Sequence, residues 1–339
     1  MSSGEDSNDD HVLFLPLVSE ELVSLPLPIN VVSTYWNVPL PMAEAVEAAK
    51  RYPGFGGGVI IEGVELAERH GLACVMLHSD MRGLKAAIDA GIPPIVILPG
   101  IPGNPEITQH ASVISGYGGG GGGDDDDDDD YTVHHYVQEG TAEGDPQEGA
   151  IPAGMFDREW SEEGRLMILV APPENLSPLP IRIPAQVSVA CRLCFDAERA
   201  MILGDRQGAA GSLKEALEMD PGNVTALQML GGLCNAQNLP ECVGYYERCA
   251  QANGNAYLAY NGLGNYYLKR GEFARAESYY TRAIKINPKR SARIYKNRAY
   301  LREKQGMTDG AREDLGTYLR YLPGAPDRGA IKRAIKGLS

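Results

Sequence analysis

Residues 257–288, YLAYNGLGNYYLKRGEFARAESYYTRAIKINP, contain a pattern that can be traced from about residue 190 to the end of the chain. The pattern predicts two short helices joined by a turn at Arg270-Gly271. Its small and large apolar residues fall at helical spacing: Leu263, Gly264, Tyr267, Ala276, Tyr280 and Ala283. Small residues suit the places where two helices approach closely, and large ones fill the space between them. Pro288 is expected to end the second helix.

Other copies of the pattern lie before and after this one. They keep Ala209, Leu213, Ala216 and Pro221 about two repeats earlier, Leu230, Gly231 and Ala250 in residues 224–256, and Ala299, Gly306, Ala311, Leu315 and Pro323 in residues 292–325. This recurrence at about 34 residues resembles the tetratricopeptide repeat. The resemblance implies four repeats over residues 190–325 and a capping helix in 326–339. Together they would bury apolar faces that no single repeat could bury.

The length and charge of the chain limit its class. It has 339 residues, enough for the repeats and one further domain of ordinary soluble composition. The net charge is -14, helped by the aspartate run at 124–130, while the part from Lys285 onward is basic. Nucleic acid is therefore not an expected partner, but an acidic peptide at the basic end is compatible with the charge.

A membrane protein and a disulfide-rich protein are not expected. No apolar run is long enough to span a bilayer, and the first residues, MSSGEDSNDD, lack the basic and apolar parts of a signal peptide. The sequence therefore predicts a cytoplasmic protein. Its scattered cysteines imply no disulfide framework. Cys191 and Cys194 form a CxxC pair on a predicted repeat helix, where core packing is the first interpretation and a redox or metal role is an alternative.

The first half of the chain is predicted to form one mixed domain. Residues 1–11 are expected to be disordered, and residues 12–18 are a strand candidate. Helices are expected over 27–36, 42–52, 60–70 and 81–90, and strands over 73–78, 95–98, 110–117, 131–137 and 166–170. A Gly/Asp-rich insertion at 118–130 is interpreted as a solvated loop, since an unstructured aspartate run binds metal only weakly. A Pro-rich linker is expected over 172–189.

Five segments of this half resemble the papain-like peptidases of the bacteriocin leader-peptidase type. They are TYWNV (34–38), GVELAERHGL (63–72), LKAAIDAGIPPIVIL (84–98), HASVISGY (110–117) and FDREW (156–160). The resemblance covers about residues 12–171, and its family includes members fused to tetratricopeptide repeats. It implies an α+β papain-like domain followed by an all-α tetratricopeptide-repeat solenoid.

The resemblance also indicates where the family's catalytic residues would stand. The family's Cys-Gly-Pro, which contains the nucleophilic cysteine, corresponds to Ser24-Leu25-Pro26. The family also has a glutamine before this cysteine as oxyanion donor, but no glutamine precedes Gln109 in this sequence. The family histidine corresponds to His110, and its Asp or Asn partner falls near His134-His135. Ser24 has a second interpretation, as the cap of the helix that follows. These replacements predict a degenerate domain without peptidase activity, in which Ser24, His110 and His135 are remnant positions.

Stacked repeats form a concave groove lined by the first helix of each unit, and extended peptides bind in such grooves. The residues expected to face it are Asn261, Asn265, Arg293, Lys296, Asn297 and Tyr300. Asparagine can bond a peptide backbone as donor and acceptor, and Arg or Lys can pair with a carboxylate. The set partly resembles the carboxylate clamp of chaperone-binding repeats. The alternative is that these residues are only solvated.

The sequence thus favours a non-catalytic interaction protein that binds a protein or peptide partner through its repeats, without a cofactor or metal. A hydrolase that uses Ser24 and His110 is the second hypothesis. A redox function at Cys191 and Cys194 is the third.

Overall fold

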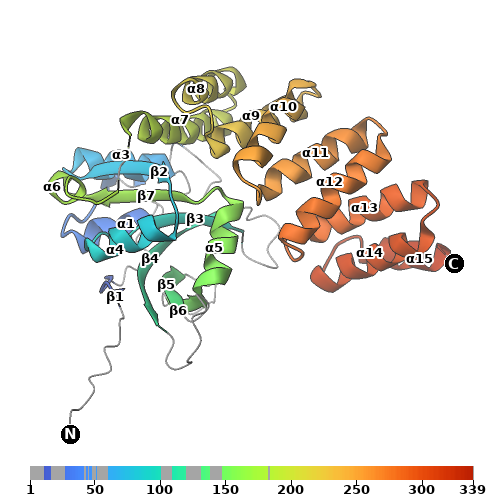
Figure 1. Cartoon of the computed structure of the whole chain (residues 1–339), viewed down its shortest axis with the longest axis horizontal. Coiled ribbons are helices and arrows are strands. Elements are labelled where there is room, and N and C mark those ends of the chain that lie inside the picture. The colour runs from blue at the N-terminus through green and yellow to red at the C-terminus, as the bar shows by residue number, and fades with distance from the viewer. Residues whose placement is uncertain are drawn as a thin grey trace, which may run out of the picture. The chain divides into compact units, whose positions relative to one another are not determined.

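The computed structural model describes residues 11–16, 27–41, 43, 44, 46, 47, 51, 60–100, 109–119, 131–137, 147–181 and 184–338 (Figure 1). The chain divides into two compact units. The first consists of residues 1–98, 111–160 and 165–220, and the second of residues 99–110, 161–164 and 221–339. The first is a mixed helix and sheet structure, and the second is mainly helical.

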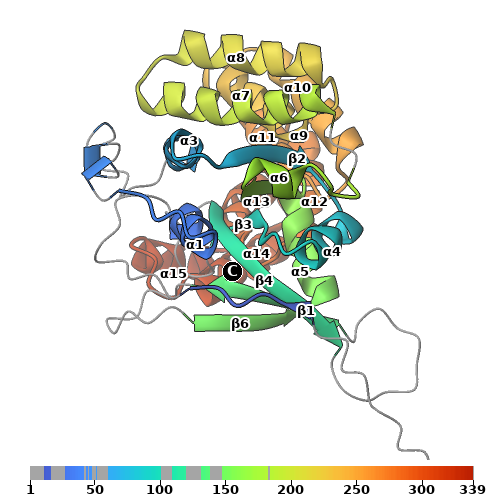
Figure 2. The same cartoon turned by 90° about the vertical axis from the view of Figure 1, so that its left-hand side faces the viewer.

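A seven-stranded sheet forms the centre of the first unit, with the order β2-β7-β3-β4-β5-β6 (Figure 1). β1 pairs with β4, and Figure 2 shows the two strands side by side. The strands are β1 (His11–Val12), β2 (Ala73–His78), β3 (Ile95–Pro99), β4 (Gln109–Gly119), β5 (Tyr131–Val137), β6 (Gln147–Pro152) and β7 (Leu166–Ala171). β2 and β3 are both antiparallel to β7, and β4, β5 and β6 form an antiparallel meander. The sheet confirms the five strands expected between residues 73 and 170.

Helices cover both faces of the sheet, because successive side chains of a strand point to opposite faces. β7 places Leu166, Ile168 and Val170 in one apolar cluster and Met167, Leu169 and Ala171 in the other. The helices in the first cluster are α1 (Leu27–Tyr35), α3 (Ile60–Arg69) and α7 (Ala185–Ile202), and those in the second are α4 (Met81–Asp89) and α5 (Ala153–Glu162). The unit is therefore a sheet between two helical layers.

Local sequence signals explain where two of these helices begin and end. Gly71 has a φ of 95°, and the Leu72 N–H donates to the Ala67 carbonyl at 3.1 Å, so a glycine in the left-handed conformation ends α3. The Asp80 carboxylate caps α4 by accepting from the Gly83 N–H at 2.9 Å. The helices expected over 27–36, 60–70 and 81–90 are confirmed. The helix expected over 42–52 lies mainly outside the described residues.

Two elements of the first unit were not predicted. β6 has the sequence QEGAIP, in which Gly and Pro are poor strand formers, and α5 follows it directly without a turn signal. The strand expected over 12–18 is shorter and begins one residue earlier: His11 and Val12 pair with β4, and the Leu13 N–H donates to the Ser115 carbonyl at 2.6 Å. Gly116 of β4 permits this approach, since a Cβ there would overlap the backbone of His11.

The stretch expected as a linker over 172–189 is partly helical. It contains α6 (Pro173–Leu176), and α7 already begins at Ala185. Pro184 stands at the N-cap of α7, where its missing N–H costs no hydrogen bond.

The first helix of the predicted repeat tract packs on the sheet of the first unit. The Met76 N–H of β2 donates to Ser188 Oγ of α7 at 3.0 Å. Arg192 of α7 donates two hydrogen bonds to the Glu68 carboxylate of α3, at 2.7 and 2.8 Å. A bidentate pair of this kind fixes orientation as well as distance. α7 and its antiparallel neighbour α8 (Arg206–Met219) therefore belong to the first unit.

The second unit continues as helix pairs. α9 (Val224–Ala236) pairs with α10 (Glu241–Ala252), α11 (Tyr257–Lys269) with α12 (Phe273–Ile286), and α13 (Ala292–Lys304) with α14 (Thr308–Tyr321), before α15 (Arg328–Gly337). One residue between the helices of each pair has a positive φ: Asn238, Gly271 and Gly306, as does Gly204 between α7 and α8. Gly takes this conformation without strain, and Asn tolerates it better than most residues. The turn predicted at Arg270-Gly271 is confirmed.

Two tyrosines hold successive helices of the second unit together. Tyr280 of α12 lies against Gly264 of α11, where a Cβ would overlap its ring. Tyr246 of α10 lies against Gly231 of α9 and also against Gly262 of the next pair. Both tyrosines are at most 4% exposed. Each glycine therefore makes room for a ring that packs between neighbouring helices.

The second repeat has a different register from the one expected. The sequence pattern assigned Ala250 to its small buried position, but Cys242, Tyr246 and Cys249 are the buried residues of α10, and Ala250 is partly exposed. The reason is a shorter turn. Cys242 follows the positive-φ residue Asn238 by four positions, whereas Ala276 follows Gly271 by five. The loss of one residue shifts the inward face of α10 by one position.

Adjacent glycines of α9 provide a matched test of this packing. Gly231→Ala should lower the free energy of unfolding by about 1–3 kcal/mol, because the added methyl group meets the Tyr246 ring. Gly232→Ala should leave it unchanged or raise it by up to about 1 kcal/mol, since nothing lies near that position and Ala favours helix. Chemical denaturation measures both. Equal effects of the two substitutions would contradict the packing described.

Candidate functional site

An amide ladder, formed by Asn261, Asn265 and Asn297, joins the first helices of two neighbouring repeats. Within α11, Asn265 Nδ2 donates to Asn261 Oδ1 at 3.3 Å. The Tyr280 hydroxyl donates to Asn265 Oδ1 at 2.7 Å, and Asn297 Nδ2 of α13 donates to the same hydroxyl oxygen at 3.4 Å. The structure therefore brings together three of the six residues expected in the groove, with Tyr280 as their connection.

Tyr280 can serve as this connection because its hydroxyl remains protonated. Burial raises the pKa of Tyr280 to about 12. The ring is fixed by its packing against Gly264 of α11, so the hydroxyl is held at one place. The amide ladder is thus positioned by a core residue rather than by flexible surface side chains.

The three remaining groove candidates have different surroundings. Lys296 donates to the Asp327 carboxylate at 2.9 Å, and the Tyr318 hydroxyl donates to the other carboxylate oxygen at 2.6 Å. Tyr300 is 46% exposed and lies edge-on to Phe273, with ring centroids 6.4 Å apart. Arg293 is exposed, and its guanidinium makes no hydrogen bond to any residue that the structure describes.

Asp327 changes what this surface can bind. The hydrogen bond from Tyr318 and the nearby Lys296 ammonium lower the pKa of Asp327. Asp327 is therefore ionised at neutral pH and balances the charge of Lys296. Among the six candidates, Arg293 is the cation that has no carboxylate partner within the described ranges of the chain. Sequence reasoning missed Asp327, because it lies between α14 and α15, outside the repeat pattern.

The remnant catalytic positions are only partly described. Ser24 lies outside the described residues. His135 lies on β5, paired in register with Ile114 and Gly149, and His110 lies near the start of β4. Burial lowers the pKa of His110, and its Nδ1 is buried without a hydrogen-bond partner among the described residues. His110 is therefore neutral at pH 7.

The cysteine pair is buried in the core of the first unit. Cys191 is 1% exposed and Cys194 is 2% exposed, and Cys194 Sγ donates to the Ala190 carbonyl at 3.3 Å. Burial raises the pKa of the Cys194 thiol well above its usual value. Redox chemistry and metal binding both require the thiolate, so this environment favours packing for the pair.

Two further properties concern the part of the chain that the structure describes. Among the described residues, there is no group of three or more His, Cys, Asp or Glu side chains that could hold a metal ion. None of its helices combines the length and apolar character needed to cross a membrane.

Comparison with known proteins identifies the repeats of the C-terminal part. A family model of the tetratricopeptide repeat matches residues 263–336. The match covers α12, α13 and α14 and most of α11 and α15, so the prediction of this repeat type is confirmed for that stretch. A search of curated proteins gave no match.

Several solved structures are partly similar to the chain. The MamA protein is 24% identical, with 44% of this chain and 84% of that chain covered and a TM-score of 0.39. PilF of Pseudomonas aeruginosa is 16% identical, with 45% and 69% covered and a TM-score of 0.41. PilW, described as a widely conserved type IV pilus biogenesis factor, is 22% identical, with 44% and 70% covered and a TM-score of 0.39.

The buried position of His110 predicts a dependence of stability on pH. Below the ordinary histidine pKa of 6.5 the unfolded chain takes up a proton that folded His110 does not. The free energy of unfolding should therefore fall as the pH drops from about 7.5 to about 5.5, and it should fall less in His110→Gln. Chemical denaturation of both proteins at the two pH values measures this. An identical pH dependence in the two proteins would show that His110 is not buried as described.

Proposed function

We propose that the protein is a non-catalytic adaptor whose repeats bind an extended peptide segment of a partner protein along α11 and α13. The observation that carries this proposal is the amide ladder fixed by the Tyr280 hydroxyl. It joins the first helices of two successive repeats, which are the helices that line the groove of a repeat array. We also propose a cytoplasmic location for the protein, as its sequence predicts.

The hydrogen bonding of the amide ladder supports recognition of a peptide backbone. At one end, Asn261 uses its carbonyl oxygen for Asn265, which leaves its Nδ2 as a donor. At the other end, Asn297 uses its Nδ2 for Tyr280, which leaves its Oδ1 as an acceptor. A peptide unit requires one donor and one acceptor. Because the asparagines are already ordered, little side-chain entropy is lost when a peptide binds.

Charge supports an acidic residue in the bound segment. Residues 285–339 contain 14 Lys and Arg against five Asp and Glu, whereas the whole chain has a net charge of -14. Much of this positive charge is internally paired, as in Arg298 with Asp314 at 2.7 Å and Lys296 with Asp327 at 2.9 Å. Arg293 is exposed and precedes Asn297 of the amide ladder by four residues in the sequence. Its guanidinium can pair with a carboxylate of the partner.

The first unit is proposed to be a degenerate papain-like domain. Its order α1, α3, β2, α4, β3, β4, β5 agrees with the order that the sequence resemblance implies. The substitution of Ser24 for cysteine and the lack of a glutamine before Gln109 argue against peptidase activity.

A hydrolase that uses Ser24 and His110 is the alternative function. The neutral His110 favours it, because a general base must be unprotonated and its Nδ1 accepts no hydrogen bond from any described residue. The structure gives no distance between the two residues, since Ser24 lies outside its described part.

Substitutions on α11 and α13 should separate the adaptor function from simple solvation of these helices. Peptides selected from a phage-displayed library against the full chain should bind about tenfold more weakly to Arg293→Glu and to Asn261→Ala, because each loses a hydrogen bond or ion pair. Lys332→Glu, an equal charge change at an exposed residue of α15, serves as the control. Fluorescence polarisation gives the affinities. If the selection yields no peptide, or if the three variants bind as the wild type does, the proposal is wrong.

Covalent labelling tests the alternative hydrolase function. A fluorophosphonate probe reacts with an activated serine, and the adaptor proposal expects no labelling of the intact protein. Labelling of the wild type that disappears in Ser24→Ala and in His110→Gln would establish the hydrolase instead. Intact-mass spectrometry measures the adduct directly.

A further inference from the structure

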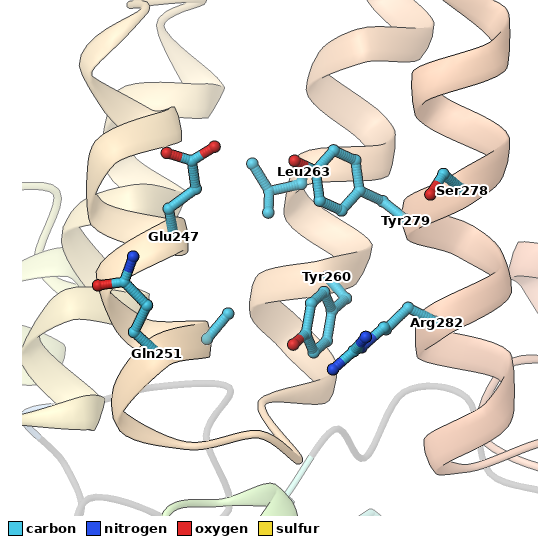
Figure 3. A pocket seen from close by; sticks show the side chains of 8 residues that line it. Glu247, Gln251, Tyr260, Leu263, Ser278, Tyr279 and Arg282 are labelled. Atoms are coloured by element: carbon cyan, nitrogen blue, oxygen red, sulfur yellow. The ribbon is translucent and has the colours of Figure 1, made fainter.

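A hollow of about 420 Å³ opens in the second unit, away from the amide ladder (Figure 3). Three helices supply its lining: Glu247, Ala250 and Gln251 come from α10, Tyr260 and Leu263 from α11, and Ser278, Tyr279 and Arg282 from α12. We refer to it as the α10–α12 hollow. None of the six residues predicted for the groove lines it.

The α10–α12 hollow and the amide ladder use different sides of α11. Successive residues of an α-helix are rotated by about 100°. Tyr260 and Leu263 therefore share one side of α11, and Asn261 and Asn265 lie on a side roughly opposite. Ligands could occupy the two places at the same time without competing for side chains.

The floor of the hollow is apolar and well ordered. Leu263 is 0% exposed and Tyr260 is 7% exposed. The Tyr279 ring stacks on Tyr267 with centroids 5.6 Å apart, and the Arg275 guanidinium lies 4.1 Å from the centroid of the Tyr267 ring. Such stacked and cation–π contacts hold aromatic rings in place. Tyr279 is partly exposed, so it offers a fixed ring against which an apolar side chain can pack.

The two walls carry opposite charges, and neither has an ionic partner in the part of the chain that the structure describes. Glu247 stands on the α10 wall and Arg282 on the α12 wall (Figure 3). Arg282 lies over the Tyr260 ring at 5.2 Å from its centroid, and neither charge forms a salt bridge within the described chain. By contrast, Arg275 on the same helix pairs with Glu272 at 2.9 Å. The hollow thus offers a carboxylate on one side of its apolar floor and a guanidinium on the other.

Exposure of the walls favours a protein segment over a small enclosed ligand. Glu247, Gln251, Ser278 and Arg282 are all exposed, so the hollow is open along its rim. Small-molecule sites enclose most of the surface of their ligand, whereas protein interfaces place an apolar anchor in a central pocket surrounded by a polar rim. The α10–α12 hollow has the second arrangement.

We propose that the α10–α12 hollow is a second protein-docking site, distinct from the amide ladder. Its occupant is a partner segment with an apolar side chain that fills the hollow, a basic residue that pairs with Glu247 and an acidic residue that pairs with Arg282. An adaptor with both sites can hold two protein segments at once.

Charge exchange tests the proposal with defined probes. The probes are four fluorescein-labelled peptides of equal length, each with a central Trp or Ala between two charged residues. Their central sequences are Lys-Trp-Glu, Lys-Trp-Lys, Glu-Trp-Glu and Lys-Ala-Glu. The full-length wild type should prefer the Lys-Trp-Glu core by about tenfold over the others. Arg282→Glu should shift the preference to Lys-Trp-Lys, and Glu247→Lys should shift it to Glu-Trp-Glu.

Two further variants act as controls. Ser278→Trp fills the hollow from an exposed wall position and should abolish preferential binding, while Asn261→Ala on the other side of α11 should leave it unchanged. Thermal unfolding checks that each variant is folded. The proposal is overturned if no peptide binds, if the preference is the same in Arg282→Glu and Glu247→Lys, or if Asn261→Ala removes it.

Discussion

The contact between a tyrosine ring and a glycine without a side chain determines how the repeats of the second unit pack. Tyr280 fills the space at Gly264, and Tyr246 fills the space between Gly231 and Gly262. At the corresponding positions of the first and last helix pairs, an alanine replaces the glycine and a leucine replaces the tyrosine. These residues are Ala197 and Leu213 in the first pair and Ala299 and Leu315 in the last, and all four are buried. A larger residue on one helix is matched by a smaller one on its neighbour, as close packing requires.

This packing also positions both proposed binding sites. The hydroxyl of Tyr280 emerges from the core where it can join Asn265 to Asn297, so the amide ladder depends on a ring that the core holds. On the other side of α11, Tyr260 and Leu263 form the floor of the α10–α12 hollow. One helix thus supplies residues to two surfaces, and its placement by Gly264 and Tyr280 affects both of them.

Much of the fold was predictable from sequence, because periodicity and turn residues are local properties. Five strands of the first unit, β2, β3, β4, β5 and β7, and the Gly271 turn follow from such signals, whereas β6 does not. The register of α10 was not predictable from the average repeat, because one residue is missing after Asn238 and Cys249 replaces Ala250 as the buried residue. The neutralisation of Lys296 by Asp327 was missed as well, since it depends on a residue outside the repeat pattern.

A double-mutant cycle on Gly264 and Tyr280 tests most directly whether this contact governs the packing of the repeats. Gly264→Ala and Tyr280→Leu should each lower the free energy of unfolding, by overpacking and by cavity formation respectively. The double substitution recreates the alanine and leucine found at Ala299 and Leu315. Its decrease in the free energy of unfolding should therefore be smaller than the sum of the two single decreases by about 1 kcal/mol or more. Losses that simply add would contradict this account.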